Sequence, residues 1–184
     1  MILYINACVR EESRTDRIAR QLLARLGDYT EINLEKENPL PLNRCTLEKR
    51  TALIESGDFN DQMFRYAHQF AAADTIVISA PYWDLSFPAI LKSYIENIMV
   101  SGITFRYSEQ GIPIGMCRAE KLYYVSTAGG PFSPDFGYDY IRSLAVGMLG
   151  IRKTELFKAD MLDIVGNDEN VIIQNAINVI NENI

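Results

Sequence analysis

Continuous apolar segments alternate along the chain with segments whose apolar residues recur every three or four positions. A continuous apolar run predicts a strand that is buried on both faces of a sheet, and the three-to-four spacing predicts a helix with one buried face. Strands are therefore expected at residues 2–5, 29–34, 75–79, 122–126 and 153–157. Helices are expected at residues 18–26, 58–70, 88–99, 141–148 and 173–180.

This alternation predicts an α/β fold with a doubly wound five-stranded parallel sheet. Right-handed crossovers would place helices on both faces, giving a three-layer α/β/α sandwich. The flavodoxin-like strand order 2-1-3-4-5 is the common solution for five strands. Because 184 residues suffice for one core, we expect residues 1–184 to form a single flavodoxin-like domain. A short extra strand is expected at residues 103–107, and residues 35–57 are expected to form a loop with at most one short helix.

Composition and charge exclude several classes of function. The chain carries 18 basic and 24 acidic residues, a net charge of −6, whereas a nucleic-acid binder needs a basic surface. No apolar run approaches the roughly twenty residues of a membrane span, so we expect a cytoplasmic protein without a membrane partner. Cys8, Cys45 and Cys117 are odd in number and form no CxxC motif, which predicts reduced thiols.

The single histidine limits metal and acid–base chemistry. One ring cannot build a histidine-based metal site, so no metal is expected. His68 lies on the polar side of the helical pattern at residues 58–70. We therefore expect it to be a solvated helix residue and not a catalyst.

Three loops are expected to converge at one edge of the sheet. In a doubly wound sheet the ligand site lies outside the carboxyl ends of the strands, near the reversal of strand order. The loops at residues 8–16, 81–87 and 126–132 follow the first, third and fourth predicted strands. The chemistry of the protein should therefore lie in these three loops.

The first loop carries donors for an anion. Ser13 and Thr15 supply hydroxyls, and Arg10 and Arg14 supply guanidinium groups just before a predicted helix N-terminus. Residues 9–25 hold five arginines against three acids, so a basic patch lies within an acidic chain. These donors suit a phosphate monoester. The loop lacks the GxGxxG motif that a dinucleotide pyrophosphate would favour, and it does not match the Walker A pattern. The alternative is that Ser13 and Thr15 only cap the helix and that the arginines are solvated.

The second and third loops suit a planar ring. Trp83, the only tryptophan, stands beside Tyr82 and near Phe87, and aromatic side chains at a sheet edge favour stacking on a ring system. The alternative is that these aromatics pack between helix and sheet. Gly129 and Gly130 would let the backbone approach a ligand closely, or would simply form a strand-to-helix turn.

Together these residues resemble the flavodoxin-like FMN-dependent NAD(P)H dehydrogenases, a family that includes NADH-azoreductases and quinone reductases. The resemblance runs along nearly the whole chain and is most specific at Ala80-Pro81, Leu91-Lys92, residues 102–107 and Gly129-Gly130. It implies an enzyme with FMN as cofactor and NAD(P)H as co-substrate. Hydride would pass from NAD(P)H to the flavin and then to a quinone or azo-type acceptor, at a site completed across a homodimer.

The resemblance also implies roles for individual residues. Ser13, Arg14 and Thr15 would bind the FMN phosphate. Residues 81–85 would line the isoalloxazine ring with a backbone N–H near Asp84 facing N5, and residues 126–130 would meet the pyrimidine edge. The expected cofactor-binding residues are Arg10, Ser13, Arg14, Thr15, Pro81, Tyr82, Trp83, Asp84, Leu85, Ser126, Thr127, Ala128, Gly129 and Gly130. No side chain is expected as an obligatory acid or base, because the cofactor supplies the redox chemistry.

Two alternatives stay open at this point. Cys8 and Arg14 have the C-x5-R spacing of low-molecular-weight cysteine phosphatases, whose thiolate attacks a bound phosphate. Against this, Glu11 and Glu12 would repel a phosphate dianion, and the chain has no Asp-Pro dipeptide for a general-acid loop. The other alternative is a non-enzymatic FMN electron carrier or regulatory module, although the Thr/Gly-rich phosphate loop of carriers is absent.

Overall fold

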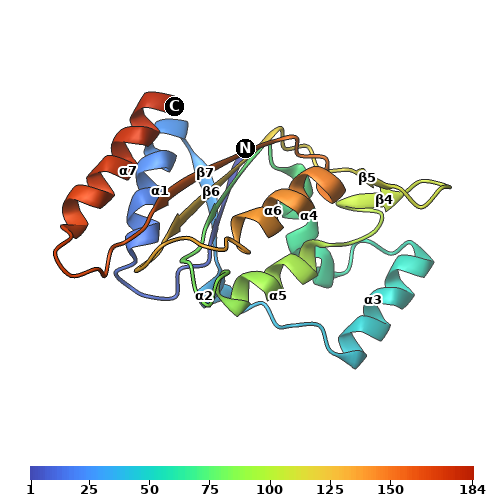
Figure 1. Ribbon diagram of the computed structural model, residues 1–184. Coiled ribbons are helices and arrows are strands. Elements are labelled where there is room, and N and C mark those ends of the chain that lie inside the picture. Colours follow the sequence, from blue (N-terminus) through green and yellow to red (C-terminus); the bar gives the residue numbers. More distant parts are fainter.

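Five parallel strands form the central sheet of the computed structural model, which describes residues 1–184 (Figure 1). They are β1 (Ile2–Asn6), β2 (Tyr29–Asn33), β3 (Thr75–Ser79), β6 (Lys121–Thr127) and β7 (Lys153–Ala159). Their order is β2-β1-β3-β6-β7, and every neighbouring pair is parallel. Counted within this sheet the order is 2-1-3-4-5, so the predicted fold class and strand order are confirmed.

Helices cover both faces of this sheet (Figure 1). On one face lie α1 (Arg14–Leu26) and α7 (Glu169–Asn183), and on the other α4 (Arg65–Ala72), α5 (Ala89–Ile98) and α6 (Tyr138–Leu144). Alternate strand residues point to opposite faces, so Tyr4 packs with the α1 side while Leu3 and Ile5 pack with the α5 side. Burial of both faces explains why the strands are continuously apolar.

The first helix begins and ends where the sequence indicates. The Ser13 hydroxyl accepts a hydrogen bond from the Asp16 N–H at 3.3 Å, so Ser13 caps α1 while Asp16 lies in the first turn. At the other end, Gly27 takes a φ of 105° and its N–H donates to the Leu23 carbonyl at 3.0 Å. These contacts fix the start of α1 at the end of the loop that follows β1.

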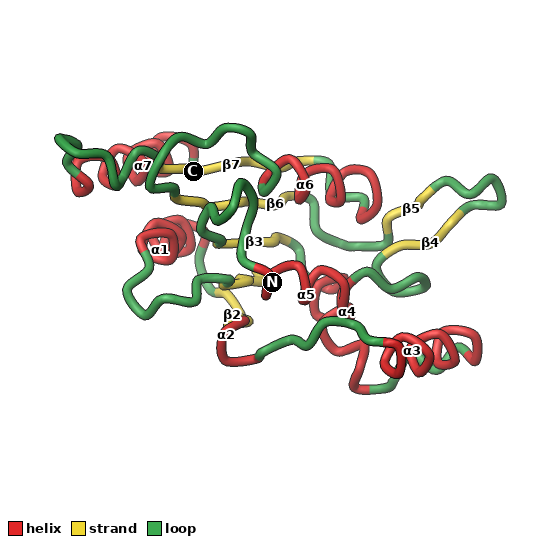
Figure 2. Tube along the Cα trace, turned by 60° about the horizontal axis from the view of Figure 1, so that its bottom comes forward, coloured by secondary structure: helices red, strands yellow, loops and turns green.

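The expectation of a loop with at most one short helix at residues 35–57 is wrong. The chain forms α2 (Leu34–Glu37) and then α3 (Arg44–Ser56), a helix of 13 residues. A capping box starts α3: the Thr46 N–H donates to Asn43 Oδ1 at 3.0 Å, and the Asn43 N–H donates to Thr46 Oγ1 at 2.9 Å. No residue of α3 is buried, so it has no apolar stripe to reveal it. Figure 2 shows α3 at the periphery, away from the sheet.

Other differences are small. The helix expected from residue 58 starts later, as a 3-10 turn, η1 (Gln62–Phe64), followed directly by α4. The extra strand is β4 (Phe105–Tyr107), which pairs with β5 (Pro113–Gly115) in an antiparallel hairpin outside the main sheet (Figure 2). α6 continues into a π-helical segment, η2 (Ala145–Leu149). None of the helices combines the length and apolar character needed to cross a membrane.

Candidate functional site

The loops after β1, β3 and β6 meet at the carboxyl edge of the sheet, as predicted. The Tyr82 N–H donates to the Thr127 carbonyl at 2.9 Å, and the Thr15 and Thr127 hydroxyls are 2.6 Å apart. Between the loops lies a cavity of about 260 Å³. Its lining residues are Val9, Arg10, Glu12, Ser13, Arg14, Thr15, Pro81, Tyr82, Trp83, Thr127, Gly129 and Asp163.

Most of the expected cofactor-binding residues line this cavity, but not all of them. Ser126 and Ala128 are buried behind it, and the Ser126 hydroxyl donates to the Ala80 carbonyl at 2.7 Å. Asp84 and Leu85 form the tip of the neighbouring turn, and Gly130 lies next to the lining residue Gly129. The structure thus brings the expected residues of the first loop together with Pro81, Tyr82 and Trp83, and leaves these five outside the lining of the cavity.

The start of α1 is built to receive an anion. The N–H groups of its first turn have no partner within the helix, and the helix dipole places partial positive charge there. Ser13 and Thr15 add hydroxyls, and Arg10 and Arg14 add guanidinium groups to the same cavity. Ser13 caps the helix and also lines the cavity, so its role as a cap leaves it placed beside the candidate anion site.

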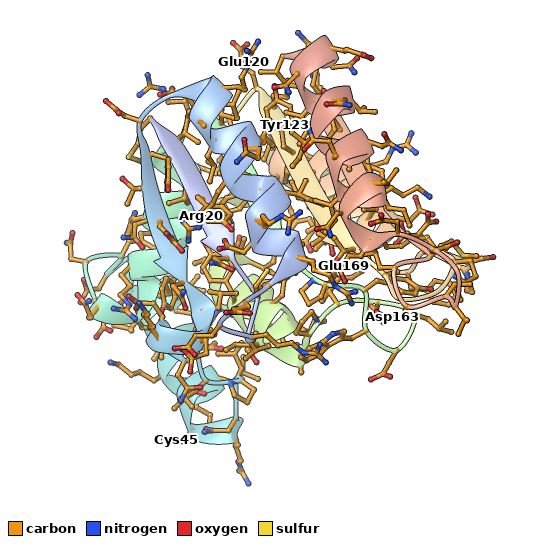
Figure 3. All side chains as sticks on the ribbon, turned by 90° about the vertical axis from the view of Figure 1, so that its left-hand side faces the viewer. Arg20, Cys45, Glu120, Tyr123, Asp163 and Glu169 are labelled. Atoms are coloured by element: carbon orange, nitrogen blue, oxygen red, sulfur yellow. The ribbon has the colours of Figure 1, made fainter.

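Asp16, an acid in the first turn of α1, is directed away from this cavity. Its carboxylate accepts hydrogen bonds from the Tyr4 hydroxyl at 2.5 Å, the Asn6 amide at 3.0 Å and the Arg20 guanidinium at 2.7 Å. Arg20 also pairs with Glu31, and it lies on the flank of α1 in Figure 3. This network neutralises a negative charge that would otherwise oppose an anion at the helix start.

Arg14 is held by two carboxylates from the other end of the chain. Its Nη1 lies 2.7 Å from Asp163 Oδ1 and 3.2 Å from Glu169 Oε2. Figure 3 shows Glu169 at the start of α7 and Asp163 in the loop before it. Arg14 lowers the pKa of the Asp163 carboxyl, chiefly through this hydrogen bond. Asp163 is not among the residues expected from the sequence, although the loop after the fifth strand begins at this same edge of the sheet.

The loop after β3 forms a tight aromatic turn. Trp83 and Ser86 exchange backbone hydrogen bonds of 3.1 and 2.8 Å, which close a two-residue hairpin over Asp84 and Leu85. Both central residues are left-handed, with φ of 49° and 66°. This conformation costs about 1–2 kcal/mol for a residue with a side chain, and such residues cluster at functional sites.

The two aromatic residues of this loop differ in freedom. The Tyr82 ring packs edge-on against Phe132 at 4.7 Å between centroids, and its hydroxyl donates to the Pro134 carbonyl at 2.5 Å. Trp83 has no aromatic partner and keeps 38% of its surface exposed. Phe87 packs against Tyr140 with 5.7 Å between centroids, as the packing alternative proposed for it. Trp83 therefore offers an exposed apolar ring face, whereas the Tyr82 ring is held in place by Phe132 and Pro134.

A side chain at Gly129 would displace the Asp163 carboxylate, because a Cβ there would lie 2.1 Å from Asp163 Oδ2. The absence of a side chain at Gly129 allows the loop between β7 and α7 to lie directly against it. A planar ring with a phosphate tail fits the donor set as a whole, with hydroxyls, N–H groups and guanidinium at one end and exposed aromatic surface at the other. The residues present therefore suit FMN.

Cys8 and His68 lie outside this arrangement. Cys8 is buried with its sulfur 3.5 Å from the Ser79 hydroxyl, and burial raises the pKa of its thiol. A buried neutral thiol that does not line the Arg14 cavity is a poor nucleophile, which opposes the phosphatase alternative. His68 is exposed on α4, as predicted, with its Nε2 2.7 Å from the Phe59 carbonyl.

The fold and site together define a flavodoxin-like α/β protein. A family model described as a flavodoxin-like fold matches residues 1–184, and the chain belongs to this family. FMN-dependent NADH:quinone oxidoreductase 2 of Clostridium acetobutylicum is 36% identical over 191 residues, which cover 96% of this chain and 94% of that protein. The FMN-dependent NADH:quinone oxidoreductase of Clostridium perfringens strain SM101 is 36% identical over 176 residues, covering 90% and 88%. The resemblance inferred from the sequence is thereby confirmed.

A solved structure shares the fold at lower identity. The FMN-dependent NADH-azoreductase from Bacillus anthracis strain Ames Ancestor, in complex with FMN, superposes with a TM-score of 0.83. Its sequence is 22% identical, and the match covers 99% of this chain and 96% of that one. At this identity the likeness supports the fold alone.

Proposed function

We propose that this protein is an FMN-dependent NAD(P)H:acceptor oxidoreductase that reduces quinone or azo-type acceptors. The observation that carries the proposal is the meeting of an anion-binding helix start with an exposed aromatic turn in one cavity at the switch point of the sheet. The clostridial relatives, named FMN-dependent NADH:quinone oxidoreductases, support the same activity. The protein acts as one domain in the cytoplasm, without nucleic-acid or membrane partners.

The chain's own residues bind and orient the cofactor. Ser13, Thr15, Arg14 and the first N–H groups of α1 hold the phosphate, with Arg10 at the rim. Residues 81–85 would line the ring, and Thr127 and Gly129, the two of residues 126–130 that line the cavity, would meet its pyrimidine edge. When bound, FMN accepts hydride from NAD(P)H and passes it to the acceptor. No side chain of the cavity is required as an acid or base.

A second copy of the chain completes the site. The cavity of about 260 Å³ falls below the roughly 300–1,000 Å³ of ordinary ligand pockets, so one chain encloses only part of a flavin. Large apolar side chains stay exposed beside it, including Leu85 at 45% and Phe136 at 59%. A homodimer would cover these side chains and form the second wall of the site.

Turnover tests the proposal. Purified protein loaded with FMN should oxidise NADH or NADPH when a small quinone is present, and removal of bound FMN should abolish the rate. No oxidation of either nicotinamide would contradict the enzymatic function and favour a carrier. Hydrolysis of p-nitrophenyl phosphate, lost on Cys8→Ser, would instead favour the phosphatase alternative.

A further inference from the structure

The position of Asp163 beside Arg14 is fixed by the backbone. The Met161, Leu162 and Asp163 N–H groups donate to the carbonyls of Gly130, Ala128 and Gly129 at 3.1, 3.2 and 2.9 Å. These three bonds attach the loop between β7 and α7 to the loop after β6. The main chain of Asp163 is therefore held beside Arg14 by bonds that do not depend on the ion pair.

This carboxylate belongs to the wall of the candidate phosphate site. Asp163 and Arg14 both line the cavity, with side-chain exposures of 65% and 26%. The charged residues of the lining are Arg10, Arg14, Glu12 and Asp163, so positive and negative charges balance there. Arg10 also acts on Asp163, since its charge contributes to the low pKa of that carboxyl.

A phosphate at this site would meet both members of the ion pair. It would have to share the Arg14 guanidinium, whose Nη1 already donates to Asp163 and Glu169. It would also approach the like charge of Asp163 across the same cavity. Riboflavin, which lacks the phosphate, would experience neither effect.

We propose that Asp163 sets how strongly the site prefers phosphorylated flavin to riboflavin, because its carboxylate competes with the flavin phosphate for Arg14. This inference rests on the proposed function, since it concerns the same cofactor site. If Asp163 instead orients Arg14 for the phosphate, its removal should weaken FMN binding, whereas competition predicts tighter binding. Substitution can therefore separate the two roles.

The test is a fluorescence titration of wild type and Asp163→Asn with FMN and, separately, with riboflavin. The Asp163→Asn protein should bind FMN about twofold to fivefold more tightly, as expected from the modest strength of exposed ion pairs, while riboflavin affinity stays unchanged. The gain should shrink in high salt, which screens exposed charges. Glu169→Gln should give a smaller gain, because Glu169 touches Arg14 but does not line the cavity.

Asp160→Asn is the matched control. Asp160 is in the same loop and carries the same charge, but its nearest cation is Lys158, at 3.9 Å, and it lies outside the cavity. FMN affinity should not change in this variant. Weaker or unchanged FMN binding by Asp163→Asn, or an equal change for riboflavin, would overturn the inference. Wild-type protein that binds neither flavin would refute the proposed function first, and this inference with it.

Discussion

The hydroxyls of Thr15 and Thr127 lie 2.6 Å apart in buried surroundings and join the first turn of α1 to the end of β6. The two residues are 112 positions apart in the chain, and both line the candidate cofactor cavity. Their hydrogen bond thus couples the stability of the fold to the alignment of the phosphate loop with the third loop of the site.

Replacing one of these threonines should destabilise the protein. Thr127→Val leaves the buried Thr15 hydroxyl without a partner, which costs about 1–3 kcal/mol. The double variant Thr15→Val/Thr127→Val should lose less than the sum of the two single variants, since neither hydroxyl is then stranded. Urea unfolding of the protein without FMN measures these differences. Thr51→Val, on the exposed helix α3, is the control, and an equal loss there would contradict the assignment.

Arg14→Ala should weaken FMN binding about tenfold or more and leave riboflavin binding nearly unchanged. The reason is that a charge-assisted hydrogen bond to phosphate contributes about 1.5–3 kcal/mol. Titration of each flavin by fluorescence quenching gives both affinities. Arg17→Ala removes the same charge from an exposed position of α1 that lies outside the cavity, and its FMN affinity should match wild type. Unchanged FMN affinity in the Arg14 variant would show that this arginine does not bind the phosphate.

Asp84→Asn should raise the two-electron reduction potential of the bound flavin. A carboxylate near the ring disfavours the anionic reduced form, and asparagine also tolerates the left-handed φ of 49° observed at this position. The expected rise is about 10–30 mV, the equivalent of a modest charge–charge interaction in a two-electron couple. Spectroscopic titration against a dye of known potential measures it. Asp28→Asn, exposed in the loop between α1 and β2, should leave the potential unchanged, and an unchanged potential in Asp84→Asn would place this carboxylate away from the flavin.

The cysteines should differ in reactivity according to burial. Burial raises the pKa of the Cys8 thiol, and it raises that of Cys117 to about 12, whereas Cys45 is exposed. A raised thiol pKa means that the thiolate is scarce at pH 8, so iodoacetamide should label Cys45 well before the other two. Mass spectrometry of timed samples reports the order. Early labelling of Cys8 would contradict this order and favour the phosphatase alternative. In the proposed function the Cys8→Ser variant should still reduce the flavin.

The sheet and the convergence of the loops could be predicted because they follow from local pattern and topology. Strands buried on both faces are continuously apolar, and a doubly wound order brings the ends of β1, β3 and β6 to one place. α3 could not be predicted from hydrophobic periodicity, because none of its residues is buried and its sequence carries no apolar stripe. Asp163 was missed for another reason. Its contact with Arg14 spans 149 positions and depends on how one loop is attached to another, which no local pattern records.

FMN titration of the purified wild-type protein tests the central claim most directly. The account predicts a yellow protein, or a colourless one that takes up added FMN, with one flavin per chain, quenched flavin fluorescence and a shifted visible spectrum. Riboflavin should bind more weakly, because it lacks the group that Ser13, Arg14 and Thr15 hold. Protein that stays colourless and leaves the fluorescence of added FMN unchanged would contradict the account.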